Sequence, residues 1–167
     1  MDEVAIRLLL VCSGLILFAI AAGQDLAFRL VSNRLPLTIC AVGVALHLLD
    51  GDVLTAVGLS LLVFLAAAFC WRRGWLGGAD VKLFGAGTML VAPGAVGTFL
   101  LDTSLAGGVL AAAYWGASRV VHRPSSARPP GLLQRIARVE RRRLHQGGPL
   151  PYAVALSAGA CLAITGG

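Results

Sequence analysis

Charged residues are scarce in this sequence. Of its 167 residues, 13% are charged and 57% are hydrophobic, whereas an ordinary soluble domain carries about 25% charged residues. A soluble domain of this length could not bury so much apolar surface. The composition therefore excludes a soluble enzyme, a disordered chain and a nucleic-acid module. It predicts one membrane domain that occupies residues 1–167.

Closely spaced cysteines are also lacking. No C-x-x-C pair is present, so a zinc site built from thiolates is not expected. We interpret the cysteines as small packing residues. The histidines are scattered too, with His47 expected at a helix end and the other two in a basic loop. The sequence therefore predicts neither a metal nor a cofactor. The residues concerned are Cys12, Cys40, Cys70, Cys161, His47, His122 and His145.

What the sequence has instead is a series of long runs without charge. A membrane-spanning helix needs roughly 17–25 mostly apolar residues, and backbone in lipid must form its hydrogen bonds internally. The sequence thus predicts an all-α, polytopic membrane protein with six transmembrane helices. The turn before the fifth is expected at residues 92–94, Ala-Pro-Gly, with the region of Asp102 as the alternative. The expected helices are 4–22, 35–49, 53–71, 80–91, 95–121 and 149–165.

The basic residues predict the orientation of the chain. If the first, third and fifth loops are cytoplasmic, they carry 13 of the 14 basic residues. Arg7 alone falls on the opposite side, where four of the acidic residues also lie. By the positive-inside rule, both termini are then expected outside the cytoplasm.

The one long polar stretch is residues 122–148. It begins with prolines and serines, and apolar residues then recur at helical spacing among arginines between 132 and 143. We expect a cytoplasmic loop with a short amphipathic helix on anionic lipid headgroups. Nucleic-acid binding is the alternative interpretation of the arginines. The positive-inside bias explains them with fewer assumptions, so no nucleic-acid partner is expected.

Two aspartates are candidate functional residues. Asp25 follows the first expected helix and Asp80 begins the fourth, so both should lie at the cytoplasmic boundary. Carboxylates at the membrane are costly and often functional. A close pair tends to share one proton, so that one carboxylate activates water while the other polarises a peptide carbonyl. The alternative is that each simply occupies a helix end, where the dipole favours Asp80.

Three short segments resemble one family. Residues 77–83, Gly-Gly-Ala-Asp-Val-Lys-Leu, are similar to the G-x-G-D-x-K-L segment of type IV prepilin peptidases, which are membrane aspartyl peptidases. Residues 25–33 resemble the family's first aspartate segment. Residues 149–154, Pro-Leu-Pro-Tyr-Ala-Val, resemble the opening of its last helix. The three occur in the family's order, at comparable spacings and on a six-helix layout.

The resemblance implies that Asp25 and Asp80 are the catalytic pair of an endopeptidase that removes the leader of prepilin or pseudopilin substrates. Such an enzyme is a multi-pass protein of the bacterial plasma membrane. The glycines would let the substrate backbone approach, and nearby polar residues would orient the first loop or bind the substrate. Lys82 could equally be an interfacial lysine. The supporting residues are Gly77, Gly78, Ala79, Lys82, Arg29 and Asn33.

The chain departs from the family pattern in two places. Ala79 replaces the second motif glycine, and residues 31–32, Val-Ser, replace the usual Ile-Pro. Alanine should be tolerated unless the turn requires a left-handed residue. The chain lacks the paired-cysteine region of bifunctional members, so peptidase activity without N-methyl transfer is expected, as in short tight-adherence (Flp) or archaeal-type relatives. The alternatives are a proton- or ion-coupled transporter component that uses Asp102 as a third carboxylate, a membrane scaffold, and an inactive pilus-assembly adaptor.

Overall fold

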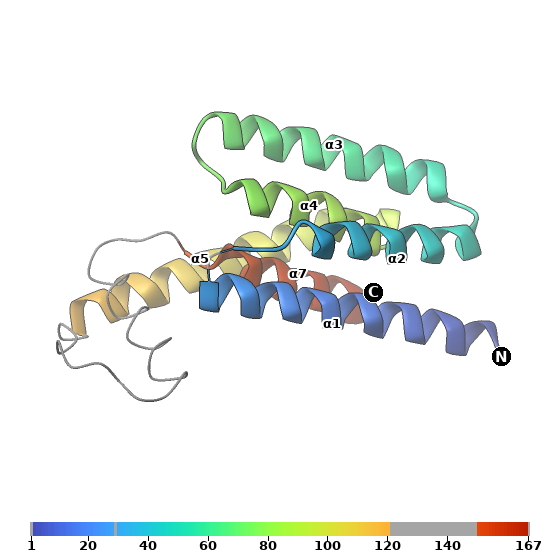
Figure 1. The fold of residues 1–167 in the computed structure, drawn as a ribbon, viewed down its shortest axis with the longest axis horizontal. Helices are drawn as coiled ribbons and strands as arrows, with labels where there is room; N and C mark the ends of the chain where they lie inside the picture. The colour runs from blue at the N-terminus through green and yellow to red at the C-terminus, as the bar shows by residue number, and fades with distance from the viewer. Residues whose placement is uncertain (1, 29, 121–149, 167) are drawn as a thin grey trace. The chain divides into compact units, whose positions relative to one another are not determined.

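The structure, a computed structural model, describes residues 2–28, 30–120 and 150–166. Helices account for 87% of these residues, and no strand occurs among them. The predicted all-α class is therefore confirmed for this part of the chain. The elements are α1 (Glu3–Phe28), α2 (Arg34–Asp50), α3 (Val53–Arg72), α4 (Gly78–Leu90), the 3₁₀ turn η1 (Pro93–Ala95), α5 (Val96–Val120) and α7 (Tyr152–Thr165) (Figure 1).

Contacts divide the chain into two units. The first unit comprises residues 1–106 and 151–167, and it contains α1 to α4, η1, the beginning of α5 and α7. The second unit comprises residues 107–150. In its described part, the Arg119 guanidinium lies over the Trp115 ring, 3.9 Å from the centroid. The expected amphipathic segment at 132–143, and with it the predicted lipid contact of the basic loop, lies outside the described residues.

Two turns between helices contain helix-breaking residues. α2 ends before Gly51, whose positive φ of 75° suits a residue without a side chain. α4 ends at Leu90 and η1 begins at Pro93, which confirms the turn expected at residues 92–94. Asp102 lies inside α5, so the alternative turn at that residue is wrong. His47 lies in the last turn of α2, as expected.

One predicted boundary is wrong in a way that matters for the site. Asp25 was expected after the first helix, but α1 continues to Phe28 and contains it. Hydropathy marks where apolar side chains end, whereas the backbone stays helical until it meets a breaker. Gln24 to Phe28 contains no proline or glycine, so nothing local ends the helix there.

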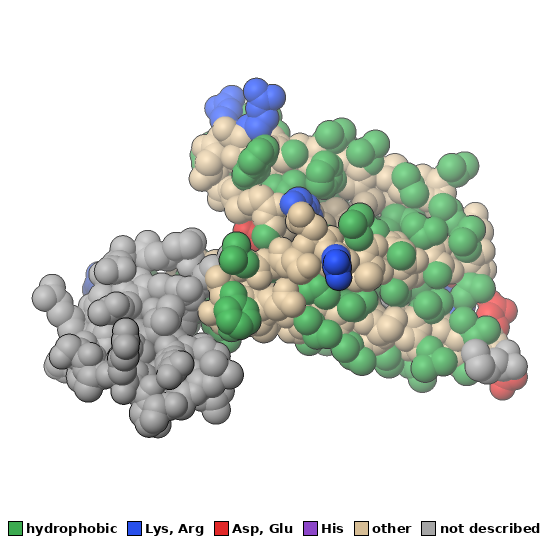
Figure 2. All heavy atoms as spheres, viewed as in Figure 1, with side chains coloured by type: hydrophobic (Ala, Val, Ile, Leu, Met, Phe, Trp, Pro, Cys, Tyr) green, Lys and Arg blue, Asp and Glu red, His purple; other side chains and the backbone are tan. Residues whose placement is uncertain are grey.

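Three described helices are long and apolar enough to cross a membrane: Glu3–Phe28, Val53–Arg72 and Pro93–Arg119. Most of the apolar surface of α1 and α3 faces outward, as at Leu8 and Leu54, and hydrophobic side chains lie along the helices on the face in Figure 2. Lipid is the natural partner of such a surface. α2, α4 and α7 have 17, 13 and 14 residues, so six crossings and the orientation of the termini stay predictions.

α4 is the central helix of the first unit. It packs against α2, α3 and α7, while α1 packs against α2 and α7. Every residue of α4 from Gly85 to Leu90 is buried, as expected of a helix that is apolar all round and enclosed by protein. The core that it shares with its neighbours includes Phe18, Ala21, Ile39, Leu46, Leu83, Ala86, Leu90, Phe99, Leu156 and Ala160.

Candidate active site

Asp25 lies in the last turns of α1 and is buried, with 8% of its surface exposed. Its Oδ2 atom accepts a hydrogen bond from the backbone N–H of Ala153, with an N···O distance of 3.2 Å. Ala153 is the second residue of α7. The first N–H groups of a helix have no partner within that helix, so this carboxylate satisfies one of the free donors of α7.

Asp80 lies in the first turn of α4, as predicted, and is half-buried. Its Oδ2 atom accepts a hydrogen bond from the backbone N–H of Gly77, at 3.2 Å. A Cβ atom at Gly77 would stand 2.8 Å from that same oxygen. The glycine therefore permits the carboxylate to fold back over the beginning of its own helix.

The first turn of α7 is related to each aspartate through a different residue. Asp25 accepts the hydrogen bond from Ala153, and the charge of Asp80 acts on the hydroxyl of the preceding residue, Tyr152. The Tyr152 ring also lies beside Phe84 of α4, with centroids 6.1 Å apart. Asp25 is thus linked to Ala153, and Asp80 acts electrostatically on the neighbouring Tyr152.

This arrangement was only partly predictable from the sequence. Tyr152 belongs to the Pro-Tyr-Ala segment that resembles the family's last helix, so this resemblance could have indicated it. The residue was nevertheless not among the predicted site residues. Ala153 contributes a backbone N–H, which no residue type reveals. Ser157 carries a similar hidden contact, because its hydroxyl donates to the Phe18 carbonyl of α1 at 2.8 Å. These bonds hold α7 against the helix that carries Asp25.

Apart from the two glycines, the predicted supporting residues lie in different places. Lys82 and Asn33 come together, because the Lys82 Nζ atom donates to Asn33 Oδ1 at 2.8 Å. Ala79 is the second residue of α4 and is helical, and the positive-φ glycines among the described residues are Gly51 and Gly74. An alanine at position 79 is therefore unstrained. Arg29 lies outside the described residues.

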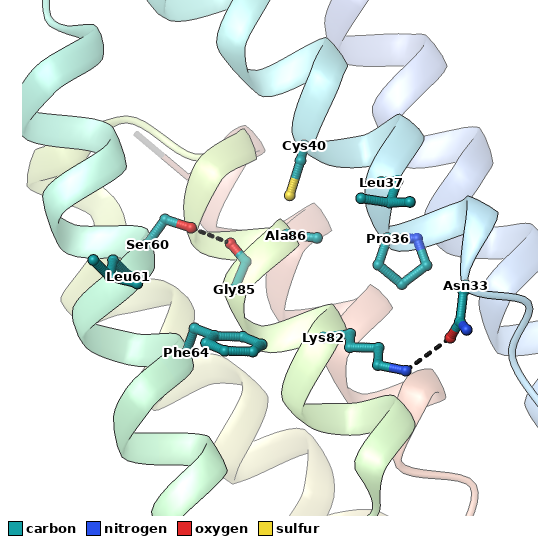
Figure 3. A pocket seen from close by; sticks show the side chains of 10 residues that line it. All are labelled: Asn33, Pro36, Leu37, Cys40, Ser60, Leu61, Phe64, Lys82, Gly85 and Ala86. Carbon is teal, nitrogen blue, oxygen red and sulfur yellow. Dashed lines mark hydrogen bonds between the residues drawn. The ribbon is translucent and has the colours of Figure 1, made fainter.

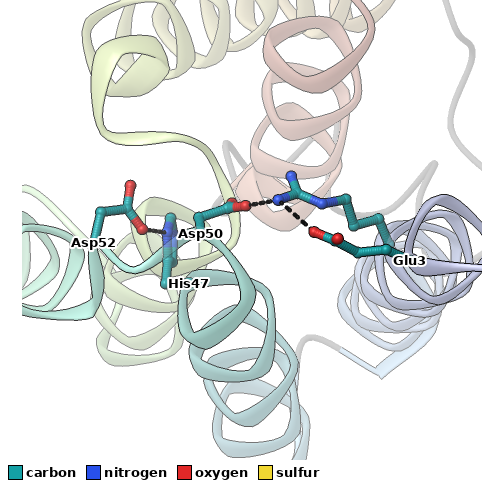
Figure 4. Close-up of polar contacts among 5 residues, drawn as sticks. Glu3, His47, Asp50 and Asp52 are labelled. Carbon is teal, nitrogen blue, oxygen red and sulfur yellow. Dashed lines mark hydrogen bonds and ion pairs between the residues drawn. The ribbon is translucent and has the colours of Figure 1, made fainter.

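A second polar cluster lies at the opposite end of α1 and α2 (Figure 4). Arg7 pairs with Asp50 and, at 3.6 Å, with Glu3. His47 Nδ1 and Asp52 Oδ1 are 2.7 Å apart, and the histidine is almost fully buried. Ligand atoms of His47, Asp50 and Asp52 lie within 4.8 Å of one another, so this group could hold a metal ion. Arg7 and His47 already engage both aspartates, which indicates a junction between helix ends.

Comparison with known proteins shows which family the chain belongs to. The sequence profile of the Type IV leader peptidase family matches residues 12–112. The chain belongs to this family. Its peptidases are of the aspartic type, so the protein is a leader peptidase of the prepilin kind and is membrane-embedded. No curated protein and no solved structure matches the chain significantly.

The matched range includes both aspartates and ends before α7. The family resemblance drawn from the sequence is thereby confirmed. The short, tight-adherence type and the absence of methyl transfer stay predictions. The hydrogen bond from α7 to Asp25 and the electrostatic effect of Asp80 on Tyr152 lie outside what the family match covers, because α7 follows the matched range.

Proposed function

We propose that Asp25 and Asp80 are the catalytic pair of this leader peptidase. The enzyme would remove the leader from a prepilin or pseudopilin at the cytoplasmic face of the bacterial plasma membrane. The observation that supports the proposal is that Asp25 accepts a hydrogen bond from the first turn of α7, where Asp80 acts electrostatically on Tyr152. Two acidic side chains at a membrane boundary are costly to maintain without a use.

The pair would hold one proton between its two carboxylates. The ionised carboxylate takes a proton from a water molecule, whose oxygen attacks the carbonyl carbon of the scissile peptide. The protonated carboxylate donates to the carbonyl oxygen, so a neutral tetrahedral diol forms. Collapse of the diol breaks the C–N bond: the leaving amine takes a proton from the protonated carboxyl group, one diol hydroxyl returns a proton to the ionised carboxylate, and the product acid is released with the pair again holding one proton. No covalent enzyme intermediate is required.

The substrate would be a basic leader followed by an apolar helix. The helix would lie in the bilayer beside the enzyme, with close packing permitted by small residues. The leader would stay in the cytoplasm, so the junction between them reaches the depth of the pair. The net negative charge of a pair that shares one proton attracts a basic leader. Asp80, the more exposed of the two, lies where substrate and water would arrive first.

Cleavage of a matching prepilin by the purified protein in vesicles tests the proposal. Asp25→Asn and Asp80→Asn should each lower the rate of leader removal by roughly 10²- to 10⁴-fold, the range for a lost acid–base group. Expression and helix content should be unchanged. The chelator EDTA should leave the rate as it is. Full activity in either variant would exclude the pair, and failure of the unmodified protein to cleave would favour an inactive adaptor.

A proton or ion relay is the second candidate, because Asp102 lies within α5 and is half-buried. Asp80 lies at the beginning of α4, whereas Asp102 follows the end of that helix. Asp102 belongs to neither of the helices that carry the proposed pair. Asp102→Asn is thus the matched control: it should leave cleavage unchanged. Reduced proton flux into vesicles with intact cleavage would favour the relay.

A further inference from the structure

A groove of about 440 Å³ lies over α4, between α2 and α3 (Figure 3). α2 and α3 each pack along α4 but make few contacts with each other, so they leave this space between them. Gly85 and Ala86 line it from α4. The remaining lining residues are Asn33, Pro36, Leu37, Cys40, Ser60, Leu61, Phe64 and Lys82.

The wall of the groove is apolar along most of its length. At Gly85, an added Cβ atom would lie 3.2 Å from the Cβ atom of Phe64, so the glycine lets α3 approach closely here. The Ser60 hydroxyl donates to the Gly85 carbonyl at 2.8 Å. Because these two polar groups of the wall are hydrogen-bonded to each other, an occupant of the groove does not have to supply a hydrogen-bonding partner for them.

One end of the groove is cationic. The Lys82 ammonium group donates to the neutral Asn33 amide at 2.8 Å, and within residues 2–28, 30–120 and 150–166 no carboxylate forms an ion pair with it. A lysine stem can cover apolar surface while its charge seeks an anion or water. The groove therefore combines an apolar wall with one cationic side chain that forms no ion pair within the described part of the chain, at the end of α4 that carries Asp80.

The rim shows what the groove opens to. Leu37 is 69% exposed and Leu61 is 55% exposed, and both belong to helices of a membrane-embedded protein. The surrounding medium is then lipid. A helix of about 10 Å diameter and 1.5 Å rise fills roughly 120 Å³ per residue, so this volume would take fewer than four residues of a substrate helix. An acyl chain is narrower and has no backbone groups that need hydrogen bonds.

We propose that the groove binds one acyl chain of an anionic phospholipid, with the headgroup phosphate at Lys82 and Asn33. The apolar wall matches the chain, and the lone ammonium group complements the phosphate. Asn33 holds the lysine side chain at the mouth through its hydrogen bond. The site does not depend on the proposed catalytic pair, so it should persist in the Asp80→Asn variant.

Photo-cross-linking in vesicles tests this site. The probe is phosphatidylglycerol with a diazirine in its acyl chain, and peptide mass spectrometry locates the cross-links. The unmodified protein should be labelled at residues that line the groove. Unlabelled phosphatidylglycerol should compete about fivefold better than phosphatidylcholine, the factor that corresponds to about 1 kcal/mol for one lysine at an anionic headgroup.

Variants sharpen the test. Lys82→Gln should remove the preference for phosphatidylglycerol, Lys82→Arg should keep it, and Cys40→Phe should fill the groove and lower labelling by either lipid. Arg72→Gln is the matched control, since it removes a cation from the end of α3 outside the groove, and it should keep the preference. Equal competition by both lipids, labelling elsewhere only, or displacement of the probe by a prepilin peptide would overturn the proposal.

Discussion

Gly77 could be needed for either of two reasons: to leave room for the Asp80 carboxylate, or to let the substrate backbone approach. A substitution can separate them. An added Cβ atom would lie 2.8 Å from Asp80 Oδ2, so Gly77→Ala should push that carboxylate from its hydrogen bond. We expect kcat for leader removal to fall by up to roughly 10²-fold, as for a reacting group misplaced by about 1 Å. The measurement is single-turnover cleavage with saturating enzyme.

Gly78→Ala is the control for this prediction. A Cβ atom at Gly78 would make an ordinary contact, 3.5 Å from Trp71 Nε1, and alanine favours the first turn of α4. Its effect on kcat should be much smaller than that of Gly77→Ala. Equal losses in both variants would mean that the two glycines act together through the approach of the substrate backbone.

At the scale of helices, the close packing of α2 against α4 depends on Gly43. A Cβ atom there would overlap the Met89 carbonyl of α4, and backbone gives way less readily than a side chain. Gly43→Ala should therefore lower the free energy of unfolding by about 1–3 kcal/mol, the usual range for overpacking. Unfolding in mixed micelles, followed by circular dichroism, measures this.

The matched control is Gly58→Ala on α3, where a Cβ atom would meet nothing within 4 Å. It should leave stability unchanged or raise it by up to about 1 kcal/mol through helix propensity. A loss of stability in Gly58→Ala as large as that in Gly43→Ala would show that the close approach at Met89 is not the cause.

For the molecule as a whole, the charge distribution predicts that the N-terminus lies outside the cytoplasm. Single-cysteine variants Asp2→Cys and Trp75→Cys, in a background without the native cysteines, place a thiol at each proposed side, and Trp75 is 71% exposed. An impermeant maleimide should label Asp2→Cys in intact cells and Trp75→Cys only after permeabilisation. Labelling in the reverse order would invert the topology and place Asp80 outside.

Helix positions were largely predictable, because charges, Pro93 and Gly51 punctuate the apolar runs. The extent of α1 past Asp25 was not, since a single carboxylate does not end a helix. The central burial of α4 was not predictable either. Lipid is as apolar as a protein core, so an uncharged run does not reveal which of the two surrounds it.

The candidate site, too, was predictable only in part from the sequence. Asp25 and Asp80 could be chosen from their residue type and from the helix count between them. The hydrogen-bond donor of Asp25 could not be predicted, because Ala153 acts through its backbone. The pairing of Lys82 with Asn33 also joins residues that no local spacing connects. Such contacts depend on how the helices pack, which periodicity alone does not specify.

The bond between Ala153 and Asp25 joins residues 128 positions apart. A ribosome that adds about 5–20 residues per second needs roughly 6 to 26 s to make that interval. For this time Asp25 is in a nascent chain that lacks this hydrogen-bond donor, so its surroundings are complete only after α7 has been made. A transcript cut short before α7 would then yield a protein in which Asp25 lacks this hydrogen bond.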